Sequence, residues 1–137
     1  MKEEKGIGFL FMEPKLQEGD FLFQKVKEDD RGIIWKIQYK NKDFWLSLTK
    51  KGKSRGGDIH SCFQYNAILT GSFVVRQKLK KEDKVSKIDS PSLMIIPPEV
   101  PHVFTALEDS LMIEWHSKKL PPYEEKRFYE PYRRMCT

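Results

Sequence analysis

The fold is decided by one stretch of the sequence, Gly52-Lys-Ser-Arg55-Gly-Gly-Asp58-Ile-His60-Ser-Cys-Phe-Gln64-Tyr-Asn-Ala-Ile-Leu-Thr-Gly71. Residues i and i+2 of an extended strand point to the same face, so Asp58 and His60 are predicted to share a face. Gln64 and Asn66 continue this polar row beside the apolar Ile68. Buried polar groups cost free energy unless they are paired. The row therefore indicates a wet cavity or a binding site inside the protein.

The spacing of this stretch resembles the first motif of the cupin superfamily, whose positions read Gly, His, His, Glu and Gly. Here the pattern is Gly52-x5-Asp58-x-His60-x3-Gln64-x6-Gly71. A second stretch, Pro97-Pro-Glu-Val-Pro-His102, is similar to the second cupin motif, Pro-x-Gly-x-x-His. The spacing is kept, but three identities depart from the motifs: Asp58 stands for His, Gln64 for Glu and Glu99 for Gly.

Within the cupins, the pair Arg55-Gly56 resembles the sugar-nucleotide branch, which holds dTDP-keto-sugar epimerases and ketoisomerases. Asp30-Arg31-Gly32, Ile96-Pro97-Pro98 and the tyrosine-rich tail are similar to segments of the same enzymes. The resemblance covers about Asp29 to Tyr132. It implies an all-β fold, the cupin-type double-stranded β-helix or jelly-roll barrel.

The rest of the chain agrees with an all-β fold, because short β-branched and aromatic segments alternate with turn residues. Strands are expected near 21–26, 33–39, 44–49, 58–69, 73–79, 84–88, 92–96, 102–107 and 111–115. We interpret residues 1–137 as a single domain. Residues 1–20 form an N-terminal arm or edge strand in this interpretation, and 121–137 form a C-terminal tail with one short helix.

Composition narrows the class of protein. The net charge is +5, but lysines and glutamates are interleaved and 33% of residues are charged, so no nucleic-acid partner is predicted. The apolar runs are too short for a membrane span, and the charged opening predicts no signal peptide. Cys62 and Cys136 form no spacing motif, which favours a reduced, cytoplasmic protein.

Four residues are candidate metal ligands if a metal binds: His60, His102, Asp58 and Gln64. Two imidazoles and a carboxylate suit iron or manganese, and zinc is also possible. The alternative is that no metal is required, since Gln is a weak neutral ligand and the resembling sugar-nucleotide cupins turn over without one. The alternative for His102 is that it is a core residue with its hydrogen bonds satisfied. His116 is interpreted as a solvated residue beyond the last strand.

The resemblance assigns a catalytic role to His60 and Asp58. Isomerising a keto-sugar removes a proton next to a carbonyl, which needs a base with a pKa near neutrality. Asp58 stands where the epimerases have their basic histidine. It either acts as the base itself, or orients His60, or only hydrogen-bonds the local turn.

Ligand binding is predicted for Arg55, with Lys53 and Arg76 as helpers, because guanidinium groups suit phosphate oxygens. Arg55 is expected at the rim of the barrel, while Lys53 is alternatively a loop charge and Arg76 an outward strand residue. The remaining candidates are polar or aromatic side chains that could contact a sugar or a base: Tyr65, Asn66 and Tyr132. The tyrosines are alternatively core or interface residues.

The leading hypothesis is a sugar-nucleotide isomerase or epimerase acting on a dTDP-keto-deoxysugar, with a nucleoside-diphosphate sugar as its small-molecule ligand. The alternatives are a metal-binding cupin of other small-molecule chemistry, such as an isomerase or dioxygenase, and a non-catalytic ligand-binding cupin. A homodimer is also predicted, because the apolar arm from Ile7 to Met12 exceeds what one small barrel needs.

Overall fold

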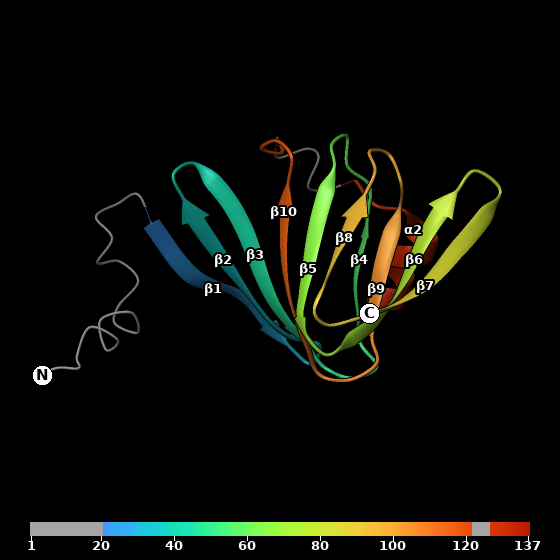
Figure 1. Cartoon of the computed structure of the whole chain (residues 1–137), viewed down its shortest axis with the longest axis horizontal. Helices are drawn as coiled ribbons and strands as arrows, with labels where there is room; N and C mark the ends of the chain where they lie inside the picture. The colour runs from blue at the N-terminus through green and yellow to red at the C-terminus, as the bar shows by residue number, and fades with distance from the viewer. Residues whose placement is uncertain (1–20, 122–126) are drawn as a thin grey trace, which may run out of the picture.

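The computed structural model describes residues 21–121 and 127–137, and these residues form two antiparallel β-sheets. The larger sheet has six strands in the order β1-β2-β3-β10-β5-β8. Their bounds are Phe21–Asp29 for β1, Gly32–Tyr39 for β2, Lys42–Thr49 for β3, Ser110–His116 for β10, Gln64–Thr70 for β5 and Ser92–Ile96 for β8. Figure 1 shows the strands fanning apart from one end of the molecule, with β1 and β7 at opposite edges of the view.

The smaller sheet has four strands in the order β4-β9-β6-β7. Their bounds are Ser54–Asp58 for β4, His102–Ala106 for β9, Ser72–Leu79 for β6 and Glu82–Asp89 for β7. The chain crosses repeatedly between the two sheets, so strands that are adjacent in the sequence often lie in different sheets. This is a jelly-roll arrangement, in which two sheets face each other across one interior.

The apolar core fills one part of this interior. Its side chains come from both sheets, as the alternation along β5, β6 and β9 requires. They are Ile68, Phe73, Val75, Ile96, Phe104, Ala106 and Met112. Polar side chains replace apolar ones further along the same inner faces, and Gln64 and Asn66 are almost fully buried there. The interior is therefore divided into a dry core and a polar cavity.

The C-terminal tail closes over the smaller sheet. It carries the short helix α2, Glu130–Arg133, and the 3-10 turn η3, Arg134–Cys136, and Tyr132 and Cys136 pack against Val103. Gly57 makes this approach possible, because its φ is +80° and a Cβ there would lie 2.6 Å from the Cα of Arg133. A residue with a side chain would be strained in that backbone conformation and would push the tail away.

The predicted all-β fold is confirmed, as are the strands and the short tail helix. The expected continuous strand over 58–69 was wrong, because β4 ends at Asp58 and β5 begins at Gln64 in the other sheet. Other strand bounds shift by one to three residues, and β10 ends at His116. Residues 1–20 lie outside the described residues, so the predicted arm and the homodimer based on it stay predictions. In the described parts of the chain, no helix has the length and apolar character needed to cross a membrane.

Candidate metal and anion site

A cavity of about 290 Å³ lies between the two sheets, and all three histidines of the chain line it. His60 lies in the turn between β4 and β5, His102 begins β9, and His116 ends β10. Asp58, Gln64 and Glu114 line the same space. Three short segments that are distant in the sequence therefore bring imidazoles and carboxylates to one place.

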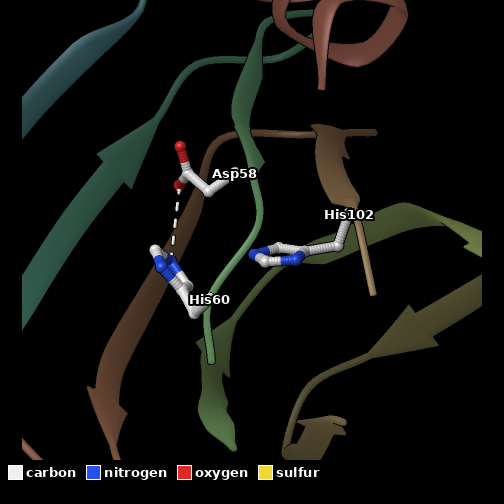
Figure 2. A group of neighbouring side chains, drawn as sticks. All are labelled: Asp58, His60 and His102. Carbon is white, nitrogen blue, oxygen red and sulfur yellow. Dashed lines mark ion pairs between the residues drawn. The ribbon is translucent and has the colours of Figure 1, made fainter. Parts of the chain in front are cut away.

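The cluster predicted from the sequence is formed. One ligand atom from each of Asp58, His60 and His102 lies within 4.8 Å of the others. Asp58 Oδ2 is 4.0 Å from His60 Nε2, and Figure 2 shows the His102 ring turned toward this pair. Gln64 lines the cavity beside them. The predicted convergence of these four side chains in one pocket is thus confirmed by the structure.

The orientation of His102 suits a metal ligand. Its Nδ1 lies 3.0 Å from the carbonyl oxygen of Val100, so the ring donates its proton there. Its Nε2 is buried, carries the lone pair and has no hydrogen-bond partner among the described residues. Burial lowers the pKa of His102, which favours the neutral imidazole that binds metals. Zinc, manganese or iron fits this donor set of imidazoles and carboxylates.

Asp58 combines burial with a mixed electrostatic environment. Burial, and then the charge of Glu114, raise its pKa to about 7, against the opposing charges of Arg133 and His116. The nearest guanidinium nitrogen, Arg133 Nη1, is 4.0 Å from Asp58 Oδ1. A carboxyl group with this pKa both accepts and releases a proton near neutral pH, as a general acid or base must.

Glu114 and His116 were not predicted as site residues, and the interpretation of His116 as solvated was wrong. His116 is the last residue of β10, and its side chain is only 6% exposed. Its Nε2 lies 3.4 Å from Glu114 Oε2. Burial alone would raise the pKa of Glu114, but contact with His116 and the charges of His102 and His60 hold it below its usual value.

The cavity also has a cationic side. It is made by Lys27, Arg31, Arg55 and Arg133. Arg55 was expected at the rim but lies inside, on β4, with 7% of its surface exposed. Its Nε, Nη1 and Nη2 atoms are buried and have no hydrogen-bond partner among the described residues. Burial and the charge of Arg31 lower the pKa of Arg55. A buried guanidinium whose donors have no hydrogen-bond partner is complementary to an anion.

The other predicted ligand contacts are placed differently. Lys53 pairs at 3.4 Å with Asp30 at the surface. Tyr65 stacks on Trp115, and the Tyr132 hydroxyl donates to Asp83 at 2.8 Å. These three residues and Arg76 do not line the cavity.

Asn66 lies behind the cavity wall and supports it. Its Nδ2 donates to Glu114 Oε1 at 3.4 Å, and its Oδ1 accepts from Gln64 Nε2 at 2.9 Å. It thus holds a carboxylate in place from the next strand.

Comparison with known proteins identifies the fold but no family. No family model matches the chain, and no curated protein matches it. Among solved structures, CapF with the inhibitor 3-isopropenyl-tropolone superposes with a TM-score of 0.67 at 18% identity, over 79% of this chain and 34% of that one. The capsular polysaccharide assembling protein CapF from Staphylococcus aureus gives 0.64 at 17% identity, over 79% and 34%. An oxalate decarboxylase OxdC mutant from Bacillus subtilis gives 0.63 at 16% identity, over 77% and 30%.

This chain spans about a third of the length of those structures. Both proteins contain the cupin fold, so the chain is an all-β protein of cupin-type jelly-roll architecture. At such identities the similarity establishes the fold alone.

Proposed function

We propose that this cupin-fold chain binds a divalent transition metal in its cavity and uses the centre on a small anionic molecule. The observation that carries the proposal is the convergence of all three histidines of the chain on one cavity that also holds carboxylates. An isolated buried histidine is often a satisfied core residue. Here three histidines come together, one from a turn and two from strands, and the Nε2 of His102 has no partner among the described residues. This set matches the donor requirements of zinc, manganese or iron.

When bound, such a metal acts as a Lewis acid toward a carbonyl, carboxylate or phosphoryl oxygen. The chain's own residues supply the rest of the site. His60 and His102 would hold the cation, and the Val100 carbonyl fixes the tautomer of His102. Asp58 lies beside them on the edge nearest Arg133 and is placed to move a proton.

The substrate class follows from the cationic side of the cavity. A buried arginine with unpartnered donors costs free energy in the ligand-free protein, and an anion would satisfy those donors. The cavity volume of about 290 Å³ is at the lower end of ligand pockets. We therefore infer a small carboxylate or phosphate compound, or the acidic end of a larger one.

The metal proposal is tested by the metal content of the protein. The chain is expressed in medium supplemented with iron, manganese and zinc, and the purified protein is measured by inductively coupled plasma mass spectrometry. The expected result is one metal per chain in the wild type and loss of that metal in His102→Gln, with Gln38→Ala as a control outside the cavity. Wild-type protein without stoichiometric metal would overturn this proposal.

The anion proposal is tested separately, by calorimetric titration of inorganic phosphate and malonate into wild type and Arg55→Gln. Binding is expected to weaken at least tenfold in Arg55→Gln, because charge-assisted hydrogen bonds contribute about 1.5–3 kcal/mol each. Equal affinity in both proteins would exclude Arg55 as the anion site.

A second candidate function is isomerisation or epimerisation of a dTDP-keto-deoxysugar by acid–base chemistry without a metal. The observation that favours it is the Asp58–His60 pair, 4.0 Å apart in a cavity that a sugar ring could enter. Its test is exchange of deuterium from solvent into a dTDP-keto-sugar by chelator-treated protein, with loss of exchange in Asp58→Asn. Binding of the nucleotide without exchange would instead favour a non-catalytic ligand-binding protein.

A further inference from the structure

Strand β10 brings Glu114 and His116 into the cavity, and neither belongs to the stretch that first indicated a site. We infer that the metal is held by His60, His102, His116 and Glu114, and that Asp58 and Gln64 are not its ligands. This inference rests on the proposed metal-binding function and specifies which donors perform it. The centre would then contain three imidazoles and one carboxylate.

The distances support this set. Ligand atoms of His60, Glu114 and His116 all lie within 4.8 Å of one another. The His116 ring meets the His60 ring edge to face with 4.8 Å between centroids, and the centroid of the His102 ring is 5.8 Å from that of His60. His60 is thus common to both groups of possible ligands, so one ion beside it can be reached from β9 and from β10.

The sheet register explains how β10 donors come to lie there. His116 is the register partner of Gln64, and Glu114 is the register partner of Asn66. Directly opposed residues of antiparallel strands project on the same face with neighbouring Cβ atoms. The imidazole and carboxylate on β10 therefore lie one strand across from the polar row on β5, at the same level of the cavity.

The electrostatic surroundings distinguish the two carboxylates. Asp58 is near the guanidinium of Arg133, which compensates its charge in part. Glu114 has no lysine or arginine within 4.0 Å in the described part of the chain, and the ion-pair partner it has there is His116, whose Nε2 lies 3.4 Å from Glu114 Oε2. A carboxylate that is largely removed from solvent, as Glu114 is with 26% of its side chain exposed, is stabilised by a cation nearby. A metal held by the three imidazoles would supply it.

Hydrogen bonds behind the carboxylate agree with a ligand role. Asn66 donates to Glu114 Oε1, and Gln64 donates to Asn66, so the amides hold the carboxylate from behind. This is the support that outer residues give to metal-binding carboxylates. The other oxygen, Oε2, lies 3.4 Å from His116 Nε2, and Glu114 lines the cavity.

The test uses the full chain, stripped with chelator and loaded with one equivalent of zinc. X-ray absorption at the zinc edge is expected to count three imidazoles in the wild type and two in His116→Gln. Zinc titration against a chelating indicator is expected to show an affinity loss of at least about 100-fold in Glu114→Gln and His116→Gln, since even outer-residue changes cost about 10–100-fold. Asp58→Asn and Gln38→Ala are expected to stay within about tenfold, the small end of that range, because Asp58 is not a ligand in this set and Gln38 lies outside the cavity.

Two imidazoles in the wild type would overturn the inference, as would zinc binding in the β10 variants that equals the wild type. A larger loss in Asp58→Asn than in Glu114→Gln would also overturn it. The imidazole count of the wild type decides the question even where a variant fails to fold. If the wild type binds no zinc, iron or manganese, the proposed function fails as well. If the wild type binds zinc tightly and the β10 variants bind it equally well, only the ligand set is refuted.

Discussion

Gln64 and His116 are register partners on adjacent strands, and both side chains line the same cavity. One is a neutral amide at a position where the sequence motif places a carboxylate ligand, and the other is an imidazole that the motif does not include. The pair shows that the metal-binding capacity of this cavity is distributed over β5 and β10 together. Asn66 accepts a hydrogen bond from Gln64 and donates one to Glu114, so it holds Glu114 in place.

Asn66→Ala is expected to lower zinc affinity by about 10–100-fold, because it removes the hydrogen bond that orients Glu114 without removing a ligand. The measurement is zinc titration with a competing indicator. Gln38→Ala is the control, since the Gln38 amide also donates to a carboxylate, that of Asp43, but does not line the cavity. The same affinity in Asn66→Ala and Gln38→Ala would show that Asn66 has no such role.

Arg55→Met is expected to stabilise the ligand-free protein by about 1 kcal/mol or more, because it removes a buried charge whose donors have no partner. The same change is expected to abolish the binding of phosphate and malonate. Chemical denaturation and calorimetry measure the two effects. A less stable variant would mean that Arg55 is satisfied in the ligand-free protein and that the anion site has to be reconsidered.

Gly57→Ala is expected to lower the free energy of unfolding by about 2 kcal/mol or more, through backbone strain at positive φ and collision with the backbone of Arg133. Gly52→Ala is the matched control, since Gly52 has a similar φ of +83° but open space around its Cβ. The difference between the two variants isolates the packing of the tail on β4. Equal losses in urea denaturation would exclude that contact as a source of stability.

Asp29 links stability to pH. The usual pKa of an aspartate is about 3.9. The hydrogen bond from Arg31 lowers the pKa of Asp29 to about 2, although burial acts to raise it. Since the folded pKa is depressed, the carboxylate stabilises the protein above pH 4, and this stabilisation is lost as the pH falls from about 4 toward 2. The effect is expected to be below about 1 kcal/mol, because solvent screens the pair.

The measurement is the free energy of unfolding of wild type and Asp29→Asn at pH 7 and at low pH. The two proteins are expected to differ at pH 7 and to converge as the pH approaches 2. Asp30→Asn serves as a control, because the Asp30 side chain is 82% exposed. A gap between wild type and Asp29→Asn that widens in acid would contradict the assigned sign.

Much of the fold and part of the site could be predicted from the sequence. Two-residue alternation placed Asp58, His60 and the β5 amides in one interior, because the period of a strand is a local property. The same alternation is present in Met112, Glu114 and His116, and it was the available signal for the second half of the site. It was missed because the strand was ended one residue too early, at Trp115.

The remaining features depend on pairing between distant segments. The register that sets His116 beside Gln64 joins residues on strands far apart in the chain, and no local pattern specifies it. The burial of Arg55 depends on β4 pairing with β9, and the tail packs against the same strand. Sequence spacing alone therefore placed this arginine at the rim rather than within the cavity.

The central claim is a metal centre built on three histidines and Glu114, and a crystal structure of the metal-loaded protein tests it most directly. Anomalous diffraction at the zinc or manganese edge locates the ion independently of any assumed ligand set. The predicted result is a single peak in the cavity, about 2.0–2.2 Å from nitrogen atoms of His60, His102 and His116 and from an oxygen of Glu114. A peak bound instead by Asp58 and Gln64, or a loaded crystal with no peak in the cavity, would contradict the claim.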